Sequence, residues 1–187
     1  LGNGPADLPD RLMGAGFRAV GLDRAMVLED AGPCLALART LAARRGLELE
    51  HVGRGPERRS IDVARLLVQA FDVETDRVPA LGAETLATGR RAGSAVLLVL
   101  EAGVPAAVAR RMSVGDGTYL SSIGTAPPLR GRGLGSLVTA LAVAEALVDR
   151  PAFIHLLVEA TNVPAIRLYE RLGFTLLGEP IVDLLMR

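Results

Sequence analysis

The apolar positions in the first half of the chain alternate between the period of an amphipathic helix and that of a strand. Helical patterns cover 7–15, 35–45, 60–71 and 81–91, and strand-like runs cover 17–20, 25–29 and 47–52. Gly46 can close one of these helices in a left-handed conformation, and Ser60 can cap the next. The alternation predicts a domain that mixes helices with strands.

After Gly93 the pattern changes to three strands joined by short turns, which indicates an antiparallel meander. These strands are expected over 95–101, 104–112 and 119–125, with glycine in each connecting turn. The remaining elements are a long amphipathic helix, a buried strand, another helix and a closing hairpin, expected over 133–148, 153–158, 162–172, 174–177 and 181–186.

A segment near the N-terminus repeats the spacing of the C-terminal one. Leu12, Gly16-Phe17 and 26–28 lie at the spacings of Tyr169, Gly173-Phe174 and 183–185. A helix, a Gly-Phe pair and a strand also occur together by chance. A degenerate tandem repeat and a coincidence therefore both stay open at this point.

Composition excludes several classes of function. Half of the 187 residues are hydrophobic, enough for a sizeable core, and 21 Lys+Arg balance 21 Asp+Glu, so the basic face that nucleic acid requires is not expected. Every basic residue is Arg, and without Lys the chain has no P-loop. One Cys and two His cannot supply the usual zinc ligands, so we expect no metal.

Cysteine usage and hydropathy bear on the compartment. Cys34, the only cysteine, lies in an apolar run, so we expect a buried thiol and a reducing cytoplasm. Apolar stretches fall short of the ~20 residues that span a membrane, and the first residues lack the basic region of a signal peptide. The chain does not begin with Met, and we expect it to belong to a longer one.

The stretch 123–136 reads IGTAPPLRGRGLGS, between an expected strand and an expected helix. A glycine-rich elbow at a helix start leaves backbone N–H groups unpaired, and these bind anions together with the helix dipole. Arg130 and Arg132 add donors that suit phosphate oxygens. These features predict a pyrophosphate cradle. A dinucleotide fold is a weak alternative, because the third glycine after Gly131 comes one position too early for GxGxxG.

Two motifs resemble one family. RGRGLG at 130–135 resembles the R-x-x-G-x-G/A signature of the general N-acetyltransferase (GNAT) superfamily, which holds the pyrophosphate of coenzyme A, and Ile123, Thr125 and Pro127 match its upstream frame. NVPAIRLYERLGF at 162–174 resembles the family segment N-x-x-A-x-x-L-Y-x-x-x-G-F, with matches at Asn162, Ala165, Leu168, Tyr169, Gly173 and Phe174. The resemblance covers residues 96–187.

The resemblance implies an α/β fold with a central, mostly antiparallel, splayed sheet flanked by helices. By similarity, Ile123, Gly124 and Thr125 would face the pantetheine arm of acetyl-CoA, and Asn162 would lie near it. Tyr169 would be the general acid toward the leaving thiolate, although a tyrosine on the inner face of a helix is also an ordinary core residue. The residues implied to hold the pyrophosphate are Arg130, Gly131, Arg132, Gly133, Leu134, Gly135 and Ser136.

The reaction implied is direct transfer of acetyl from acetyl-CoA to a primary amine of a small molecule or protein. An ammonium with a pKa near ~10.4 must lose a proton before it attacks. No Asp, Glu or His lies in 119–126, where the base often sits in this family, so Glu101, Asp116 and a water chain are the alternatives. The missing carboxylate also keeps open a non-catalytic acyl-CoA-binding module.

The domain that resembles the family is expected over 46–187. Residues 1–45 would be an extension, or the tail of a degenerate first GNAT unit in which Leu12 stands at the tyrosine position. The acidic loop 72–76 could attract a cationic amine or simply be solvated. The resemblance also suggests a homodimer.

Overall fold

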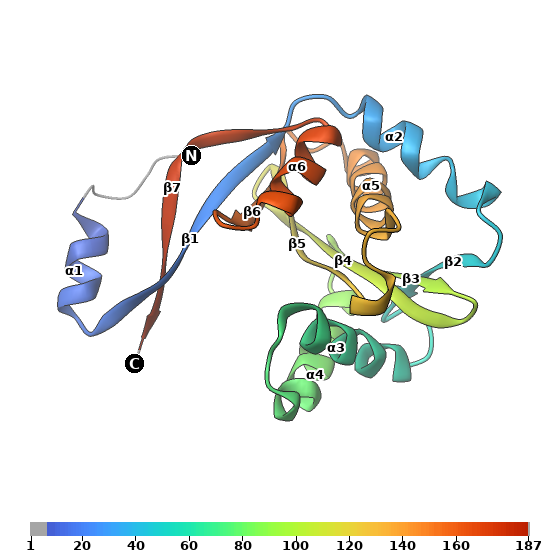
Figure 1. Cartoon of the computed structure of the whole chain (residues 1–187), viewed down its shortest axis with the longest axis horizontal. Helices are drawn as coiled ribbons and strands as arrows, with labels where there is room; N and C mark the ends of the chain where they lie inside the picture. The colour runs from blue at the N-terminus through green and yellow to red at the C-terminus, as the bar shows by residue number, and fades with distance from the viewer. Residues whose placement is uncertain (1–6, 187) are drawn as a thin grey trace.

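Residues 7–186 are described by the computed structural model, in which seven strands form one sheet (Figure 1). In sheet order the strands are β2 (Leu47–Val52), β3 (Ser94–Glu101), β4 (Val104–Val114), β5 (Gly117–Thr125), β6 (Ile154–Glu159), β1 (Phe17–Leu28) and β7 (Phe174–Met186). Only β5 and β6 pair in parallel, and every other neighbouring pair is antiparallel. The expected α/β fold with a mostly antiparallel sheet is confirmed.

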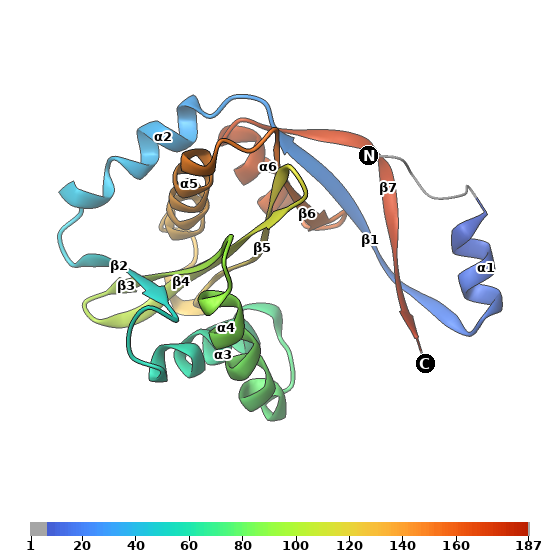
Figure 2. The same ribbon diagram turned by 180° about the vertical axis from the view of Figure 1, so that it is seen from behind.

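Helices cover both faces of the sheet (Figures 1 and 2). α3 (Arg58–Phe71) and α4 (Val78–Arg90) lie on one face, whereas α5 (Leu134–Ala146) and α6 (Val163–Arg171) lie on the other, with α2 (Gly32–Ala38) packed outside α5. The shorter elements are α1 (Leu8–Gly14), η1 (Leu41–Ala43), η2 (Thr75–Arg77), η3 (Pro127–Leu129) and η4 (Leu147–Asp149).

The helix α5 is buried nearly all round, and the expectation of an amphipathic helix is wrong. Leu137, Val138, Ala142 and Val143 are fully buried although they point in different directions around the helix. One side packs on β3, β4 and β5, and the other lies under α2. A helix enclosed between two layers needs no polar stripe.

The prediction of a C-terminal hairpin is also wrong. Residues 174–186 form one strand, and the position of a second hairpin arm is taken by β1. Gly178, which has φ +63°, lies at a register shift between β1 and β7, so the apparent turn is an irregularity within a strand. The two short strands expected over 17–20 and 25–29 are likewise one strand, β1.

Several helix ends differ from the expectations by a few residues. The helix expected over 35–45 ends at Ala38 and is followed by η1, and Gly46 then takes the left-handed conformation with φ +80°. α3 begins earlier than expected, so Ser60 lies within it and donates from Oγ to the carbonyl of Glu57 (2.8 Å). Propensity fixes where a helix is more reliably than where it starts.

Segments before residue 46 belong to the same sheet and its covering layer. β1 is paired with β6 and β7, and α2 covers α5. Beyond β6, β1 and β7 continue away from the body as a two-stranded ribbon with α1 at its far end (Figures 1 and 2).

Candidate functional site

The glycine-rich elbow leads into α5 through two left-handed residues. Gly131 and Gly133 both have φ +77°, a conformation that disfavours any residue with a Cβ. Gly133 is the N-cap of α5, and no side chain caps this end. The first intrahelical bond runs from the Leu137 N–H to the Gly133 carbonyl (3.0 Å).

Three consecutive N–H groups therefore lie open at the start of α5. Within the described part of the chain, nothing accepts a hydrogen bond from the backbone N–H of Leu134, Gly135 or Ser136. Together with the positive end of the helix dipole, these donors form a site for an anion.

Gly135 brings this helix start close to the sheet. A Cβ at Gly135 would lie 3.2 Å from Oγ1 of Thr125 and 3.6 Å from Cδ1 of Leu168. The elbow, the end of β5 and α6 therefore meet at one point. Two segments that the sequence predicts as one site, 123–125 and 130–136, are adjacent in space.

The two arginines of the elbow bind different elements. Arg130 donates from Nη2 to the carbonyl of Ala70 at the end of α3 (2.7 Å). Arg132 forms a two-point ion pair with Glu101 at the end of β3, at 2.8 and 2.6 Å. Both guanidinium groups are on exposed residues, so each can exchange its protein partner for a phosphate.

β5 and β6 separate beside the elbow. Their parallel pairing covers only Thr118–Leu120 of β5 against Ile154–Leu156 of β6, after which β5 stays paired with β4 and β6 with β1. Ser122 has φ +49° at a register shift in β5, where the strand bends. Ile123, Gly124 and Thr125 thus lie along the open side of a wedge.

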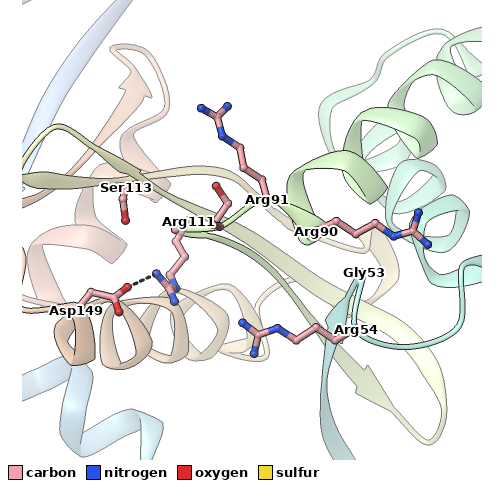
Figure 3. Close-up of a pocket in the computed structure, with 11 residues that line it drawn as sticks. Gly53, Arg54, Arg90, Arg91, Arg111, Ser113 and Asp149 are labelled. Carbon is pink, nitrogen blue, oxygen red and sulfur yellow. Dashed lines mark hydrogen bonds and ion pairs between the residues drawn. The ribbon is translucent and has the colours of Figure 1, made fainter.

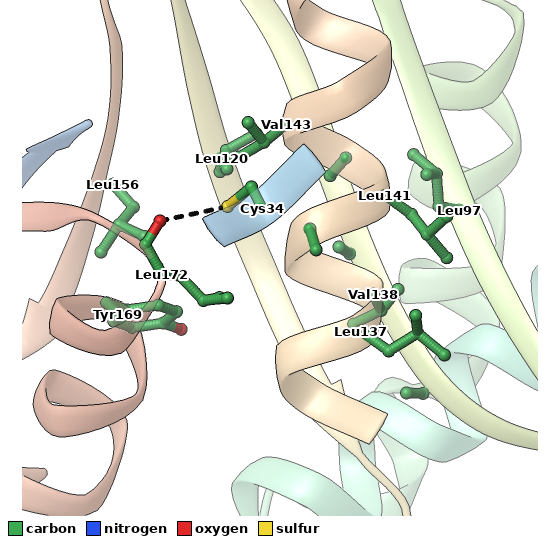
Figure 4. Packing of buried hydrophobic residues seen from close by; sticks show 14 of the residues in the cluster. Cys34, Leu97, Leu120, Leu137, Val138, Leu141, Val143, Leu156, Tyr169 and Leu172 are labelled. Atoms are coloured by element: carbon green, nitrogen blue, oxygen red, sulfur yellow. Dashed lines mark hydrogen bonds between the residues drawn. The ribbon is translucent and has the colours of Figure 1, made fainter. Parts of the chain in front are cut away.

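Tyr169 occupies the inner face of α6, with 7% of its surface exposed. Burial raises the pKa of its hydroxyl to about 12, so the group is protonated at neutral pH. Its ring makes an edge contact with Phe174, and Figure 4 shows the hydroxyl on the side that faces α5. Asn162 is the N-cap of α6, and its side chain accepts from the Ala165 N–H (3.2 Å).

The carboxylates considered as a base do not reach the wedge freely. Glu101 is held by Arg132, and Asp116 lies in the turn before β5, at the end opposite Thr125. Another strand brings further carboxylates to the wedge. Asp23 of β1 lies directly opposite Glu159 of β6, so both carboxylates lie on one face of the sheet at the edge of the wedge.

This face also carries an aromatic pair. Tyr119 and His155 are opposite each other on β5 and β6, and their rings stack at 5.1 Å. Burial and the charge of Asp23 raise the pKa of Tyr119. Burial lowers the pKa of His155, which favours a neutral imidazole packed between Tyr119 and Phe153. Asp23 and Glu159 come together only because β1 is inserted beside β6, and no local feature of the sequence links residue 23 to residue 159.

Two cavities lie at the opposite end of α5. The larger, about 510 Å³, is lined by Arg54, Arg90, Arg91 and Arg111 (Figure 3). Arg111 is neutralised by Asp149 and Glu145, and Arg90 pairs with Glu57. The carbonyl ends of α4 and α5 also face this region, which opposes anion binding. The elbow, not this cavity, is therefore the better anion site.

Cys34 is buried, as predicted. Its Sγ donates to the carbonyl of Leu172 at 3.3 Å, and burial together with the charge of Asp30 raises the thiol pKa to about 12 (Figure 4). Among residues 7–186, no cluster of His, Cys, Asp or Glu could hold a metal ion. In the same residues, no helix is long and apolar enough to cross a membrane.

Comparisons with known proteins agree with this geometry. The family model described as "FR47-like protein" matches residues 98–181. A mycothiol acetyltransferase of Corynebacterium kroppenstedtii is 45% identical over 53 residues, which are 28% of this chain and 15% of that protein.

Solved structures resemble nearly the whole chain. A GCN5-related N-acetyltransferase from Kribbella flavida superposes on 91% of this chain, with a TM-score of 0.62 and 21% sequence identity. A tandem GNAT protein from the clavulanic acid biosynthesis pathway superposes on 94% of it, with a TM-score of 0.64 and 18% sequence identity. The ribosomal-protein-S18-alanine N-acetyltransferase of Escherichia coli superposes on 68% of this chain and 76% of its own length. Its TM-score is 0.56 and its sequence identity is 22%. The chain spans only 60% and 58% of the first two structures. The chain thus has the fold of these GNAT structures, and its residues 98–181 match the FR47-like family model.

Proposed function

We propose that this protein is an acetyl-CoA-dependent N-acetyltransferase that acts on a primary amine of a small molecule or protein. The observation that carries the proposal is the row of open N–H groups at the start of α5, placed beside the gap between β5 and β6. An anion site next to an exposed strand edge suits a ligand that carries a pyrophosphate and an amide-containing arm.

The roles of the chain in binding acetyl-CoA follow from these positions. The N–H groups of Leu134, Gly135 and Ser136 would hold the pyrophosphate, with Gly131 and Gly133 permitting close approach. Arg130 and Arg132 would add charge after leaving Ala70 and Glu101. Backbone groups of Ile123, Gly124 and Thr125 would pair with the pantetheine arm, near Asn162.

Two carboxylates support an amine as the acceptor. Asp23 and Glu159 are directly opposite each other on neighbouring strands, so both carboxylates lie on one face of the sheet. A cationic acceptor would complement two adjacent carboxylates. We assign the general base to Asp23, which lies on the same sheet face as Tyr119, and the binding of the ammonium to both carboxylates.

Tyr169 would complete the transfer by donating its proton to the departing thiolate. The tyrosine stays protonated at neutral pH because burial raises its pKa to about 12. Attack by the amine on the thioester carbonyl forms the C–N bond, the C–S bond breaks, and the sulfur takes the phenolic proton. The tyrosinate is then reprotonated from the amine through Asp23 or solvent.

A non-catalytic acyl-CoA-binding module is the second candidate, because the base is not on β5. Under either candidate function, residues 1–45 would be the tail of a degenerate first GNAT unit. The tandem GNAT structure provides a precedent for two such units in one chain. Leu12 in place of a tyrosine leaves that tail without a proton donor.

Two measurements separate these readings. Calorimetry with acetyl-CoA tests the cradle, and absence of binding at micromolar protein would reject both. A thiol-release screen over polyamines, aminoglycosides, amino acids, peptides and deacetylated mycothiol then tests catalysis. The last acceptor is included because of the local match to a mycothiol acetyltransferase. Binding without turnover on any amine would favour the module.

A further inference from the structure

The two faces of strand β6 differ in burial. Leu156 and Val158 are buried in the main core, whereas Leu157 and Glu159, which alternate with them, are exposed. Successive side chains of a strand point to opposite faces of its sheet. One face of β6 therefore packs on the core, and its other face, which we call the open face, meets solvent.

The pairing of β6 with β1 and of β1 with β7 extends the open face across three strands. Leu157 lies opposite Ala25, and Ala25 lies opposite Leu177. Residues directly opposite each other share a face, so these three side chains form one apolar row across the sheet. Leu157 is 39% exposed, Ala25 is 9% exposed and Leu177 is 44% exposed. The apolar row thus presents aliphatic surface to solvent.

The two carboxylates of the proposed acceptor site occupy the next row of the open face. Glu159 lies opposite Asp23, and Asp23 lies opposite Ile181, which is 48% exposed. Both carboxylates are two residues from the apolar row along their strands, a separation of about 7 Å at the usual rise of a strand. An ammonium site and an aliphatic surface are therefore neighbours on one face.

The apolar row begins at the wedge. The parallel pairing of β5 with β6 ends at Leu120 and Leu156, so Leu157 is the next residue of β6 along the gap between the two strands. Under the proposed function, this gap receives the pantetheine arm and its thioester. Leu177 lies at the other end of the row, on the last strand of the sheet. An alkyl chain on the row points from the reaction centre toward the edge of the sheet.

We propose that the acceptor is an amphipathic primary amine, an alkylamine whose apolar chain lies on the row formed by Leu157, Ala25 and Leu177. This inference rests on the proposed function. The ammonium group binds at Asp23 and Glu159, and the chain covers the aliphatic side chains beside them. A polyamine fits less well, because a second ammonium group placed on the apolar row loses its hydration without gaining a partner.

Charge favours this occupant over a second copy of the chain. A symmetric pair of copies uses the same patch on both sides of its interface. Such a contact brings Asp23 and Glu159 of each copy toward the carboxylates of the other, and like charges repel across an interface. A ligand with one positive charge and an apolar chain matches both rows of the open face.

A homologous series of amines tests the proposal. Thiol release from acetyl-CoA is measured with n-propylamine, n-butylamine, n-pentylamine and n-hexylamine, and with spermidine. We expect kcat/KM to rise about twofold to fourfold for each added methylene, because each one removes more apolar surface from water. Spermidine should be acetylated about tenfold less efficiently than n-hexylamine. A kcat/KM that stays flat or falls along the series, or a preference for spermidine, overturns the proposal.

Substitutions on the two faces of β7 locate the alkyl chain. Leu177→Ser should lower kcat/KM for n-hexylamine about fivefold and change that for n-propylamine less than about twofold. Leu176→Ser is the matched control, because Leu176 is also exposed (40%) but lies opposite the buried Met26, on the core face. The control should leave the ratio of the two amines unchanged. Equal changes of this ratio in both variants overturn the proposal.

Binding measurements separate failure of this inference from failure of the proposed function. Calorimetry with n-hexylamine and n-propylamine, on protein saturated with CoA, requires no acetyl transfer. Tighter binding of n-hexylamine that is lost in Leu177→Ser supports the alkylamine site. If no amine is acetylated, that result rejects the proposed function alone. Equal binding of the two amines overturns the inference. A dimer in sedimentation that Leu177→Ser converts to a monomer assigns the open face to a second copy and also overturns it.

Discussion

Arg132 and Glu101 form a two-point ion pair at the cradle, from Nη1 to Oε2 at 2.8 Å and from Nη2 to Oε1 at 2.6 Å. The pair joins the elbow before α5 to the end of β3, and it occupies the guanidinium that would face a phosphate. Under the proposed function, acetyl-CoA would therefore compete with Glu101 for Arg132.

Removing the charge of Glu101 should tighten acetyl-CoA binding. Glu101→Gln is expected to lower Kd about twofold to fivefold, because an exposed ion pair is worth up to ~1 kcal/mol. Arg132→Ala should raise Kd about tenfold, because a charge-assisted contact is lost. Calorimetry measures both, with Glu48→Gln on β2 as the exposed control. Weaker binding by Glu101→Gln would show that Glu101 positions Arg132 instead of competing for it.

The close approach at Gly135 predicts a sensitive position. Gly135→Ala places a Cβ 3.2 Å from Oγ1 of Thr125, so the helix start must shift by a few tenths of an ångström. We expect acetyl-CoA affinity to fall about fivefold, with a small change in stability. Gly55→Ala, where a Cβ meets nothing within 4 Å, is the matched control. Unchanged affinity in Gly135→Ala would place the ligand away from this turn.

Tyr169→Phe tests proton donation. Removal of the hydroxyl should lower kcat about 100-fold and leave KM for acetyl-CoA nearly unchanged. Because the pKa of Tyr169 is about 12, its ionisation cannot produce a basic limb in the rate profile below pH 10. Steady-state kinetics over pH 6 to pH 10 provide the measurement. A variant with the activity of the wild type would leave Tyr169 as a core residue.

Asp23→Asn tests the base on the inserted strand. We expect kcat/KM at neutral pH to fall about 100-fold and the loss to shrink as pH rises, because more of the acceptor amine is then deprotonated without help. Acetyl-CoA affinity should not change. Asp10→Asn in α1 is a control on an exposed carboxylate far from the wedge. A loss that is independent of pH would assign Asp23 to binding alone.

Cys34 predicts a dependence of stability on alkaline pH. Burial raises the folded-state pKa of the thiol from 9.0 to about 12, so its contribution is complete below pH 9 and is lost as pH rises toward 12. Across that window, the free energy of unfolding of the wild type should fall by up to about 1.4 kcal/mol per pH unit more than that of Cys34→Ala. Urea unfolding of both proteins at several pH values measures the difference. Parallel curves would mean that the thiol is accessible to solvent in the folded state.

The sequence by itself determined the local parts of this protein. The glycines at 131 and 133 need left-handed backbone, Asn162 caps its helix, and short turns connect β3, β4 and β5, so each of these features follows from residues near one another in the chain. The residues proposed to form the cradle were named from the sequence for the same reason.

Only the tertiary structure decided which distant segments meet. β1 lies between β6 and β7 although well over a hundred residues separate it from either, and this insertion replaced the expected hairpin and placed Asp23 opposite Glu159. The burial of α5 on both sides likewise depends on α2. A strand carries the same hydrogen-bonding groups along both edges, so its own sequence cannot specify its neighbours, which are chosen by the packing of the whole sheet.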